Sequence, residues 1–248
     1  MATQRSVVIN GDLGSGKSTV SRLLAERLGI RRISVGDLYR EMARQRDMTA
    51  LQLNLHAELD DKIDHYVDQL QADIAMSGEP LVVDSRLAWF FFRDALKVHL
   101  VTDPTVAAHR VMGRPADDVE RYGSVDEARP RLAERSESER VRFIHRYGVD
   151  KTRLRNYNVV CDSTRATPEE IVARIIGALS GSRDDTQLFI DPRRIDLTGG
   201  PGADHGPVRL GYAGPRFFTV TGSRAVDTAV RAGHTLVAAS LAAATGPD

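Results

Sequence analysis

The stretch Gly11-Asp-Leu-Gly-Ser-Gly-Lys-Ser18 decides the fold of this chain. It follows a short β-branched run, Ser6–Asn10, and opens an apolar helical pattern that starts at about Lys17 and ends at Gly29. Glycines let consecutive backbone N–H groups point at one ligand, because no side chain stands in the way. The N-terminus of the following helix adds a partial positive charge. Strand, glycine-rich turn and helix in this order therefore predict a cradle for a polyanion.

The same stretch satisfies the P-loop pattern G-x-x-x-x-G-K-[ST], which holds the phosphates of ATP. Lys17 is expected to reach the β- and γ-phosphates and to act in catalysis, while the Ser18 hydroxyl is expected to ligate Mg²⁺. The residues predicted to bind ATP are Gly11, Asp12, Gly14, Ser15, Gly16, Lys17, Ser18 and Thr19.

Strands and helices alternate after this loop. Further strands are predicted at Arg31–Val35, Pro80–Asp84, Lys97–Val101 and Asn158–Asp162. Helical patterns cover Asp37–Gln45, about Leu55 to Met76, the segment after Asp103, about Val125 to Arg146, and the segment after the capping box Thr167-Pro-Glu-Glu170. This alternation predicts an α/β protein of the P-loop NTPase kind, a three-layer α/β/α sandwich around a mostly parallel five-stranded sheet.

The character of the chain changes after Ser180. A polar linker, Gly181–Thr186, precedes a stretch rich in glycine and proline, and two strands, a helix and another strand are predicted beyond it. These four elements are Val208–Tyr212, Phe217–Thr221, Ser223–Ala232 and about Thr235–Ala238. We therefore expect one domain over residues 1–180, with a helical lid at about 114–150, and a small α+β appendage over residues 187–248.

Composition limits the partners of the chain. Its 248 residues contain 34 Lys+Arg and 34 Asp+Glu, so no net charge draws the protein to nucleic acid or to a membrane. The single cysteine, Cys161, excludes an internal disulfide and fits a reducing compartment. Neither a signal peptide nor an apolar run of membrane-spanning length is found. We expect a cytoplasmic protein whose partners are small-molecule nucleotides.

Two segments at strand ends bear on the second substrate. In Ser34-Val-Gly-Asp-Leu-Tyr-Arg40 the arginine lies one turn into a helix, where it either clasps a phosphate or faces solvent. Asp84-Ser-Arg86 lies at the carboxyl end of the third strand, the end that faces the ligand crevice in open α/β sheets. This pair either reads a base or a phosphate, or forms a local ion pair that caps the next helix.

One face of the predicted helix at Val125–Arg146 carries four arginines, Arg131, Arg135, Arg142 and Arg146. Like charges at such spacing repel by a few tenths of a kcal/mol per pair, roughly, and a docking anion would remove that repulsion. The alternative is a general arginine bias of the chain, with interleaved glutamates solvating the helix.

Taken together, these segments resemble the nucleoside monophosphate kinases, and among them the short cytidylate kinases of the archaeal type. The likeness covers about residues 5–180 and is carried by the P-loop, Ile33–Ala43, Val82–Ala88, Arg135–Arg140 with Tyr147–Asp150, and Tyr157–Thr164. It implies that Asp37 and Arg40 bind the acceptor monophosphate and that Asp84 and Arg86 contact a pyrimidine nucleotide. It also implies that Arg135 and Arg140 are catalytic arginines of a closing lid.

Ser85 and Trp89 stand where this family usually has glycine, so we expect a crowded acceptor pocket and a CMP-like or modified pyrimidine monophosphate as substrate. Two alternatives stay open. One is a kinase of a hydroxylated small metabolite, with Asp37 or Asp84 as the base that a hydroxyl acceptor needs. The other is a nucleotide-gated binding protein that acts through its C-terminal residues.

The segment Phe217–Ala229 distantly resembles the G-x-R-x-x-A-A segment of ParB-like domains, over about fifteen residues in all. A structural addition that packs on the first domain, or a homodimer formed through residues 187–248, is the interpretation that we favour for this part of the chain.

Overall fold

The computed structural model describes residues 5–48, 61–113, 122–181, 185–198 and 204–242. Its α-helices are α1 (Lys17–Leu28), α2 (Val35–Arg44), α4 (Asp61–Met76), α5 (Ala88–Phe91), α6 (Pro104–Met112), α7 (Val125–Tyr147), α8 (Pro168–Ala178) and α9 (Ser223–Arg231), with short 3₁₀ turns η1 (Leu154–Asn156) and η2 (Pro192–Arg194). In the part of the chain that is described, no helix is both long and apolar enough to cross a membrane.

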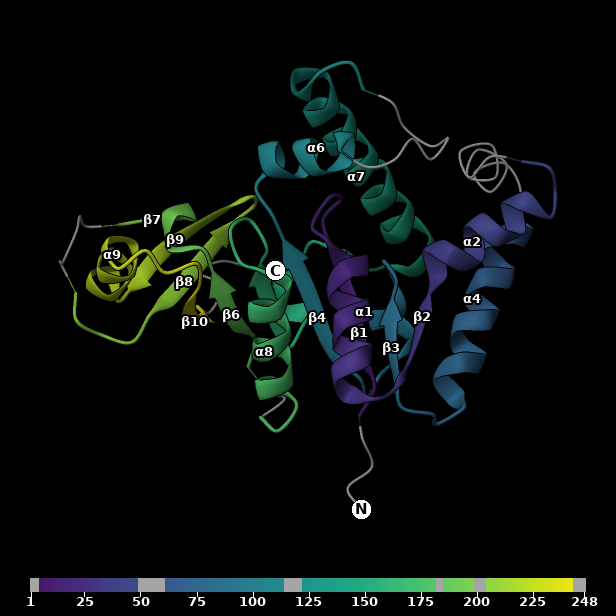
Figure 1. Cartoon of the computed structure of the whole chain (residues 1–248), viewed down its shortest axis with the longest axis horizontal. Helices are drawn as coiled ribbons and strands as arrows, with labels where there is room; N and C mark the ends of the chain where they lie inside the picture. Colours follow the sequence, from purple (N-terminus) through teal and green to yellow (C-terminus); the bar gives the residue numbers. More distant parts are fainter. Residues whose placement is uncertain (1–4, 49–60, 114–121, 182–184, 199–203, 243–248) are drawn as a thin grey trace.

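Ten strands form one sheet in the order β2-β3-β1-β4-β5-β6-β10-β8-β9-β7 (Figure 1). They are β1 (Val7–Gly11), β2 (Arg31–Ser34), β3 (Leu81–Asp84), β4 (Leu96–Val101), β5 (Val159–Asp162), β6 (Gln187–Ile190), β7 (Ile195–Asp196), β8 (Arg209–Ala213), β9 (Arg216–Thr221) and β10 (Val237–Leu241). The first five of that order pair in parallel, as predicted. The α/β fold class is therefore confirmed.

The sheet does not end at its fifth strand, however. β6 pairs in parallel with β5, and β10 then pairs antiparallel with β6. The expectation of a five-stranded sheet is corrected in this respect, because β6 hydrogen-bonds directly to β5 and the later strands extend the same sheet. The division of the chain into two domains stays a prediction.

Two apolar layers cover the two faces of the sheet. In β1, Val7 and Ile9 face one layer and Val8 faces the other, because side chains alternate along a strand. The first layer holds α1 and α8, which pack against each other in front of the sheet (Figure 1). The second layer runs from Trp89 and Phe143 to Leu210, Phe217 and further residues beyond β5. One core thus joins both parts of the chain.

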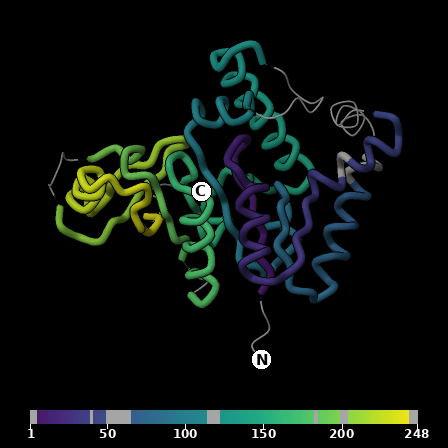
Figure 2. The backbone as a smooth tube through the Cα atoms, viewed as in Figure 1, coloured from purple at the N-terminus to yellow at the C-terminus, as the bar shows by residue number. Residues whose placement is uncertain are grey.

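We call residues 185–198 and 204–242 the C-terminal segment; it lies on one side of the molecule, beyond β5 (Figure 2). The two strands, the helix and the last strand predicted there are confirmed as β8, β9, α9 and β10. β6 and β7 were not predicted. β7 has only two residues, which is too short for the alternation of a strand to show.

Candidate active site

The P-loop joins the end of β1 to the start of α1 through two glycines in the left-handed region, Gly14 at φ 77° and Gly16 at φ 80°. A Cβ on Gly14 would lie 2.7 Å from the Ala107 carbonyl oxygen of α6, so no side chain fits at this position. A Cβ on Gly16 would meet nothing within 4 Å. Only glycine adopts this backbone without strain, and the open space at Gly16 leaves the loop amides accessible.

The side chain of Lys17 bends over this loop and donates to the carbonyl oxygens of Gly11, at 3.1 Å, and Asp12, at 3.4 Å. Desolvation, and after it the positive charge of Arg86, lower the pKa of Lys17 to about 8. The Ser15 hydroxyl is buried and has no hydrogen-bond partner among the described residues. A cation short of counter-charge and an unsatisfied donor both fit a phosphate ligand.

Ser18 donates through Oγ to Asp84 Oδ2 at 2.8 Å, so the first turn of α1 meets the end of β3. Arg32 of β2 donates to the same carboxylate oxygen at 3.1 Å and to Asp37 Oδ2 at 3.2 Å. The two predicted aspartates are therefore brought together by an arginine that the sequence analysis did not select. Its position on the second strand gave no motif by which to find it.

A hydroxyl next to a carboxylate suits Mg²⁺, which is held by one or two protein oxygens and the phosphates of its nucleotide. Ser18 and Asp84 therefore fit the ion that the P-loop pattern implies. Among the described residues there is no group of three or more His, Cys, Asp or Glu side chains that would hold a metal by itself.

Three cations of the acceptor side surround one buried carboxylate, Glu139 of α7. Arg86 forms an ion pair with Glu139 Oε1, Arg135 Nε lies 3.4 Å from the same atom, and Lys151 Nζ donates to Oε2 at 3.0 Å. We call these four residues the Glu139 cluster. The side chains of Glu139 and Lys151 are 9% and 11% exposed. Three positive charges on one carboxylate leave the cluster with an excess of positive charge.

Lys151 is the functional candidate that the sequence analysis missed. Burial is the main cause that lowers the pKa of Lys151 to about 7, and the positive charge of Arg86 is the second. Tyr157 fixes the backbone at this point, since its hydroxyl donates to the Lys151 carbonyl oxygen at 2.8 Å. The one indication in the sequence was the scarcity of lysine, since only Lys17, Lys62, Lys97 and Lys151 occur.

The other predicted residues lie apart from the Glu139 cluster or outside the description. Arg140 donates to Glu137 Oε2 at 3.0 Å and to Asp150 Oδ2 at 2.9 Å, so its guanidinium is engaged elsewhere. The side chain of Arg40 lies outside the described residues, although its backbone belongs to α2. Thr19 is exposed on the first turn of α1.

Ser85 and Trp89 both turn toward the core, which corrects the expectation of a crowded acceptor pocket. Ser85 Oγ donates to Gln71 Oε1 at 2.8 Å and accepts from the amides of Leu87 and Ala88, each at 3.2 Å. Trp89 is 5% exposed, and its ring packs edge-on against Tyr157. Replacement of glycine fills interior space here, which a comparison of sequence positions does not reveal.

A cavity of about 280 Å³ adjoins the outer side of the P-loop. It is lined by Gly14, Ser15, Gly16, Thr19, Val20, Arg110, Ser163, Ala166, Pro168 and Ile171. Arg110 of α6 donates to the Ser163 carbonyl oxygen at 2.7 Å, which ties the two walls of the cavity together. The lining combines the apolar side chains of Val20, Ala166, Pro168 and Ile171 with the polar residues Ser15, Thr19, Arg110 and Ser163, and such a mixture suits a planar heterocycle.

This geometry defines a P-loop phosphotransferase, with a phosphate cradle on one side and a cationic cluster on the other. A family model described as an AAA domain matches residues 7–142. The cytidylate kinase of Methanothermobacter thermautotrophicus is 38% identical over 163 residues, which are 66% of this chain and 98% of that protein. That of Natronomonas pharaonis is 35% identical over 181 residues, 72% of this chain and 91% of the relative. The chain belongs to the cytidylate kinase family and is a nucleoside monophosphate kinase.

A solved shikimate kinase from Bacteroides thetaiotaomicron shares the fold, with a TM-score of 0.52 and 17% identity over 71% of this chain and 98% of that one. The relatives align over about two thirds of this chain and over nearly all of their own length. The family model ends at residue 142, so the C-terminal segment lies outside the region that it matches. The distant likeness of residues 217–229 to ParB-like domains is not borne out, since β9 and α9 belong to the continuous sheet and core described above.

Proposed function

We propose that the protein transfers the γ-phosphoryl group of ATP to CMP or a closely similar pyrimidine nucleoside monophosphate. The relatives are cytidylate kinases, and the two halves of the site supply what such a reaction needs. The observation that carries the proposal is the convergence of Lys17, Arg86 and Lys151. The charge of Arg86 depresses the pKa of both lysines, so all three lie within one another's field.

In this proposal the donor lies across the P-loop. The loop amides and Lys17 hold the β- and γ-phosphates, and the base enters the cavity between Arg110 and the loop at residues 163–166. Ser18 and Asp84 hold Mg²⁺, which neutralises charge on the phosphate oxygens when it is bound. Arg32 shares Asp84 and keeps its carboxylate in place.

The acceptor lies on the opposite side, with its phosphate on the Glu139 cluster. Arg86 and Lys151 exchange part of their contact with Glu139 for the phosphate oxygens, and Arg135 approaches the transferring group from α7. Asp37 and Arg40 of α2, and Asp84, remain candidates for contacts with the monophosphate. Arg140 reaches the phosphates only if it leaves Asp150, so we assign it to a closed state of the lid.

No strong general base is needed for this transfer, because the attacking oxygen of a monophosphate is already anionic. Catalysis then rests on alignment of the two phosphates and on positive charge that stabilises the transition state. The residues of this chain that supply the charge are Lys17, Arg86, Arg135 and Lys151. Closure over the site excludes water and so prevents hydrolysis of ATP.

A screen of acceptors tests the proposal. ADP release from ATP and Mg²⁺ is measured with CMP, dCMP, UMP, AMP and base-modified pyrimidine monophosphates, and we expect CMP or dCMP to give the highest kcat/KM. A hydroxylated metabolite such as shikimate serves as the comparison substrate. Acceleration by the metabolite and by none of the monophosphates would overturn the assignment.

Two further expectations belong to this proposal. Free nucleotides are the substrates, so we place the reaction in the cytoplasm. A homodimer through the C-terminal segment also stays a prediction, to be checked by light scattering of the full chain.

A further inference from the structure

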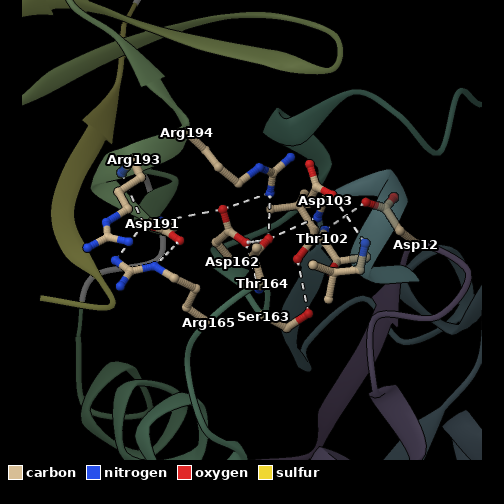
Figure 3. Close-up of polar contacts among 12 residues, drawn as sticks. Asp12, Thr102, Asp103, Asp162, Ser163, Thr164, Arg165, Asp191, Arg193 and Arg194 are labelled. Carbon is tan, nitrogen blue, oxygen red and sulfur yellow. Dashed lines mark hydrogen bonds and ion pairs between the residues drawn. The ribbon is translucent and has the colours of Figure 1, made fainter. Parts of the chain in front are cut away.

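Two ion pairs join the C-terminal segment to the end of β5 and to the loop after it, which lines the cavity, and they run in opposite directions (Figure 3). Arg194 of the C-terminal segment donates through Nη1 to Asp162 Oδ2 at 2.7 Å. Arg165 of the loop donates in return to Asp191, through Nε at 2.7 Å and Nη2 at 2.9 Å. The side chains of Asp162 and Asp191 are 0% and 2% exposed. Each buried carboxylate therefore depends on an arginine from the other part of the chain.

Asp162 links Arg194 to Thr164, because its carboxylate accepts hydrogen bonds from both residues. Its Oδ1 accepts from the Thr164 amide at 2.9 Å and from the Thr164 hydroxyl at 2.6 Å. Arg194 Nη1 also reaches that hydroxyl oxygen, at 3.2 Å. The same oxygen accepts from the amide of Asp103, whose side chain caps α6, at 2.9 Å. Arg194 therefore holds both the loop and the start of α6.

Arg110 completes this path to the cavity. It lies on α6, lines the cavity, and donates to the carbonyl oxygens of Ser163, at 2.7 Å, and Thr164, at 3.4 Å. A continuous set of contacts thus runs from Arg194 through Asp162 and Thr164 to the cavity wall. Buried hydrogen-bond networks of this kind set the position of their members more tightly than single contacts do.

We propose that Arg194 is a positioning residue for ATP, which holds the wall of the base cavity through Asp162 and the loop at residues 163–166. The inference rests on the proposed function, in which the base of ATP occupies that cavity. The family model matches residues 7–142, so Arg194 and the rest of the C-terminal segment support the donor site from outside that region.

Coupling of this kind is reciprocal. If docking of Arg194 favours the ATP-binding form of the loop, then bound ATP must favour docking of Arg194 by the same factor. The C-terminal segment then stabilises the donor site in the way that a separate subunit could, although it belongs to the same chain. The ionised form of Asp162 depends on this ion pair, because burial raises the pKa of the carboxyl and the charge of Arg194 lowers it.

Steady-state kinetics of Arg194→Gln in the full chain test the proposal. We expect KM for ATP to rise roughly tenfold, which corresponds to about 1.4 kcal/mol, while KM for CMP and kcat change less than twofold. Arg194→Lys should recover part of the loss, because a lysine keeps the charge but not the paired geometry of the guanidinium. Arg193→Gln is the matched control, since this exposed neighbour should leave all three parameters unchanged.

The pattern of the changes decides the outcome. An unchanged KM for ATP, or an equal rise in both KM values, would overturn the positioning role, since a merely structural residue lowers the active fraction without separating the substrates. Failure of the wild-type protein to turn over ATP with any monophosphate would instead overturn the proposed function.

If Arg194→Gln does not fold, the wild-type chain supplies a second measurement. A non-hydrolysable ATP analogue with Mg²⁺, at a saturation checked by calorimetry, should slow amide hydrogen exchange at residues 187–196. Unchanged exchange there, with the P-loop amides protected, would count against coupling.

Discussion

The donor half of the site and its acceptor half are built in different ways. The donor half is eight consecutive residues, Gly11–Ser18, to whose backbone the proposed function assigns most of the binding. The acceptor half gathers Arg86 from after β3, Arg135 and Glu139 from α7, and Lys151 from the turn that follows. One half is encoded locally, and the other exists only after distant segments have packed.

This difference predicts how each half responds to change. Loss of a donor-half residue removes charge from the reacting phosphate itself, so turnover should suffer. Loss of one acceptor-half cation leaves two others on Glu139, so binding of one substrate should suffer before turnover does. Four measurements test this comparison, from the largest expected effect to the smallest.

Lys17→Ala should lower kcat roughly 10²- to 10³-fold, because removal of one preorganised donor from the site of developing charge typically costs that much. The fold should persist, since the lysine is held at a cost in desolvation and contributes little stability. Coupled-assay turnover and thermal melting measure the two effects. Arg22→Ala, an exposed cation on the same helix, is the control and should retain activity. Turnover that survives Lys17→Ala would remove the P-loop from the mechanism.

Lys151→Met should raise KM for CMP roughly 10- to 100-fold, since a hydrogen bond to a charged group contributes about 1.5–3 kcal/mol. Methionine keeps the length of the side chain and removes its charge, while Glu139 keeps Arg86 and Arg135. KM for ATP should stay within about threefold of the wild-type value.

Arg153→Met is the control for this variant, two residues away and exposed. Equal effects on the two KM values would show that Lys151 does not belong to one half of the site alone.

The KM values for ATP and for CMP should also depend on pH in different ways. Lys17, with a pKa of about 8, is charged below that pH, and phosphates bind the charged form. KM for ATP should therefore be flat below pH 8 and rise above it, approaching roughly tenfold per pH unit. Lys151 has a pKa of about 7, so KM for CMP should begin to rise about one unit lower.

Saturating ATP provides the internal control, because bound phosphates hold the proton on Lys17 and kcat stays flat over the same range. Coincident pH profiles for the two KM values would contradict the assignment of one lysine to each half.

The same contrast explains what the sequence predicts well. The P-loop, the first five strands and the capped helices follow from patterns within a few residues, and they appear as expected. Asp84 and Arg86 lie where the sequence indicates, at and just after the carboxyl end of β3, because parallel strands present their carboxyl ends at one edge. Their roles in binding stay predictions.

The remaining features depend on tertiary contacts. Lys151 has no motif around it, and its burial against Glu139 arises only when the turn after α7 folds back. Arg194 lies beyond the region of family likeness, and its partner Asp162 looks in the sequence like the last residue of a strand. The direction in which a side chain points is also not evident from the sequence. Trp89 turns into the core and not into the acceptor pocket.

Ser85→Gly has the smallest expected effect and tests whether the side chain that replaces glycine at this position crowds the acceptor pocket. Gly is the residue that the family usually has here, and a crowded pocket would be relieved by it. The structure instead shows Ser85 Oγ engaged with Gln71 and with two amides of the next turn, so KM for CMP should change less than about threefold. Melting should show a loss of about 1 kcal/mol, typical of a lost intramolecular hydrogen bond. Ser85→Ala is the matched control, because it removes the same hydrogen bonds and keeps the Cβ. A tenfold fall in KM for CMP with glycine but not with alanine would mean that the Cβ itself limits the acceptor, and Ser85 would then join the acceptor half of the site.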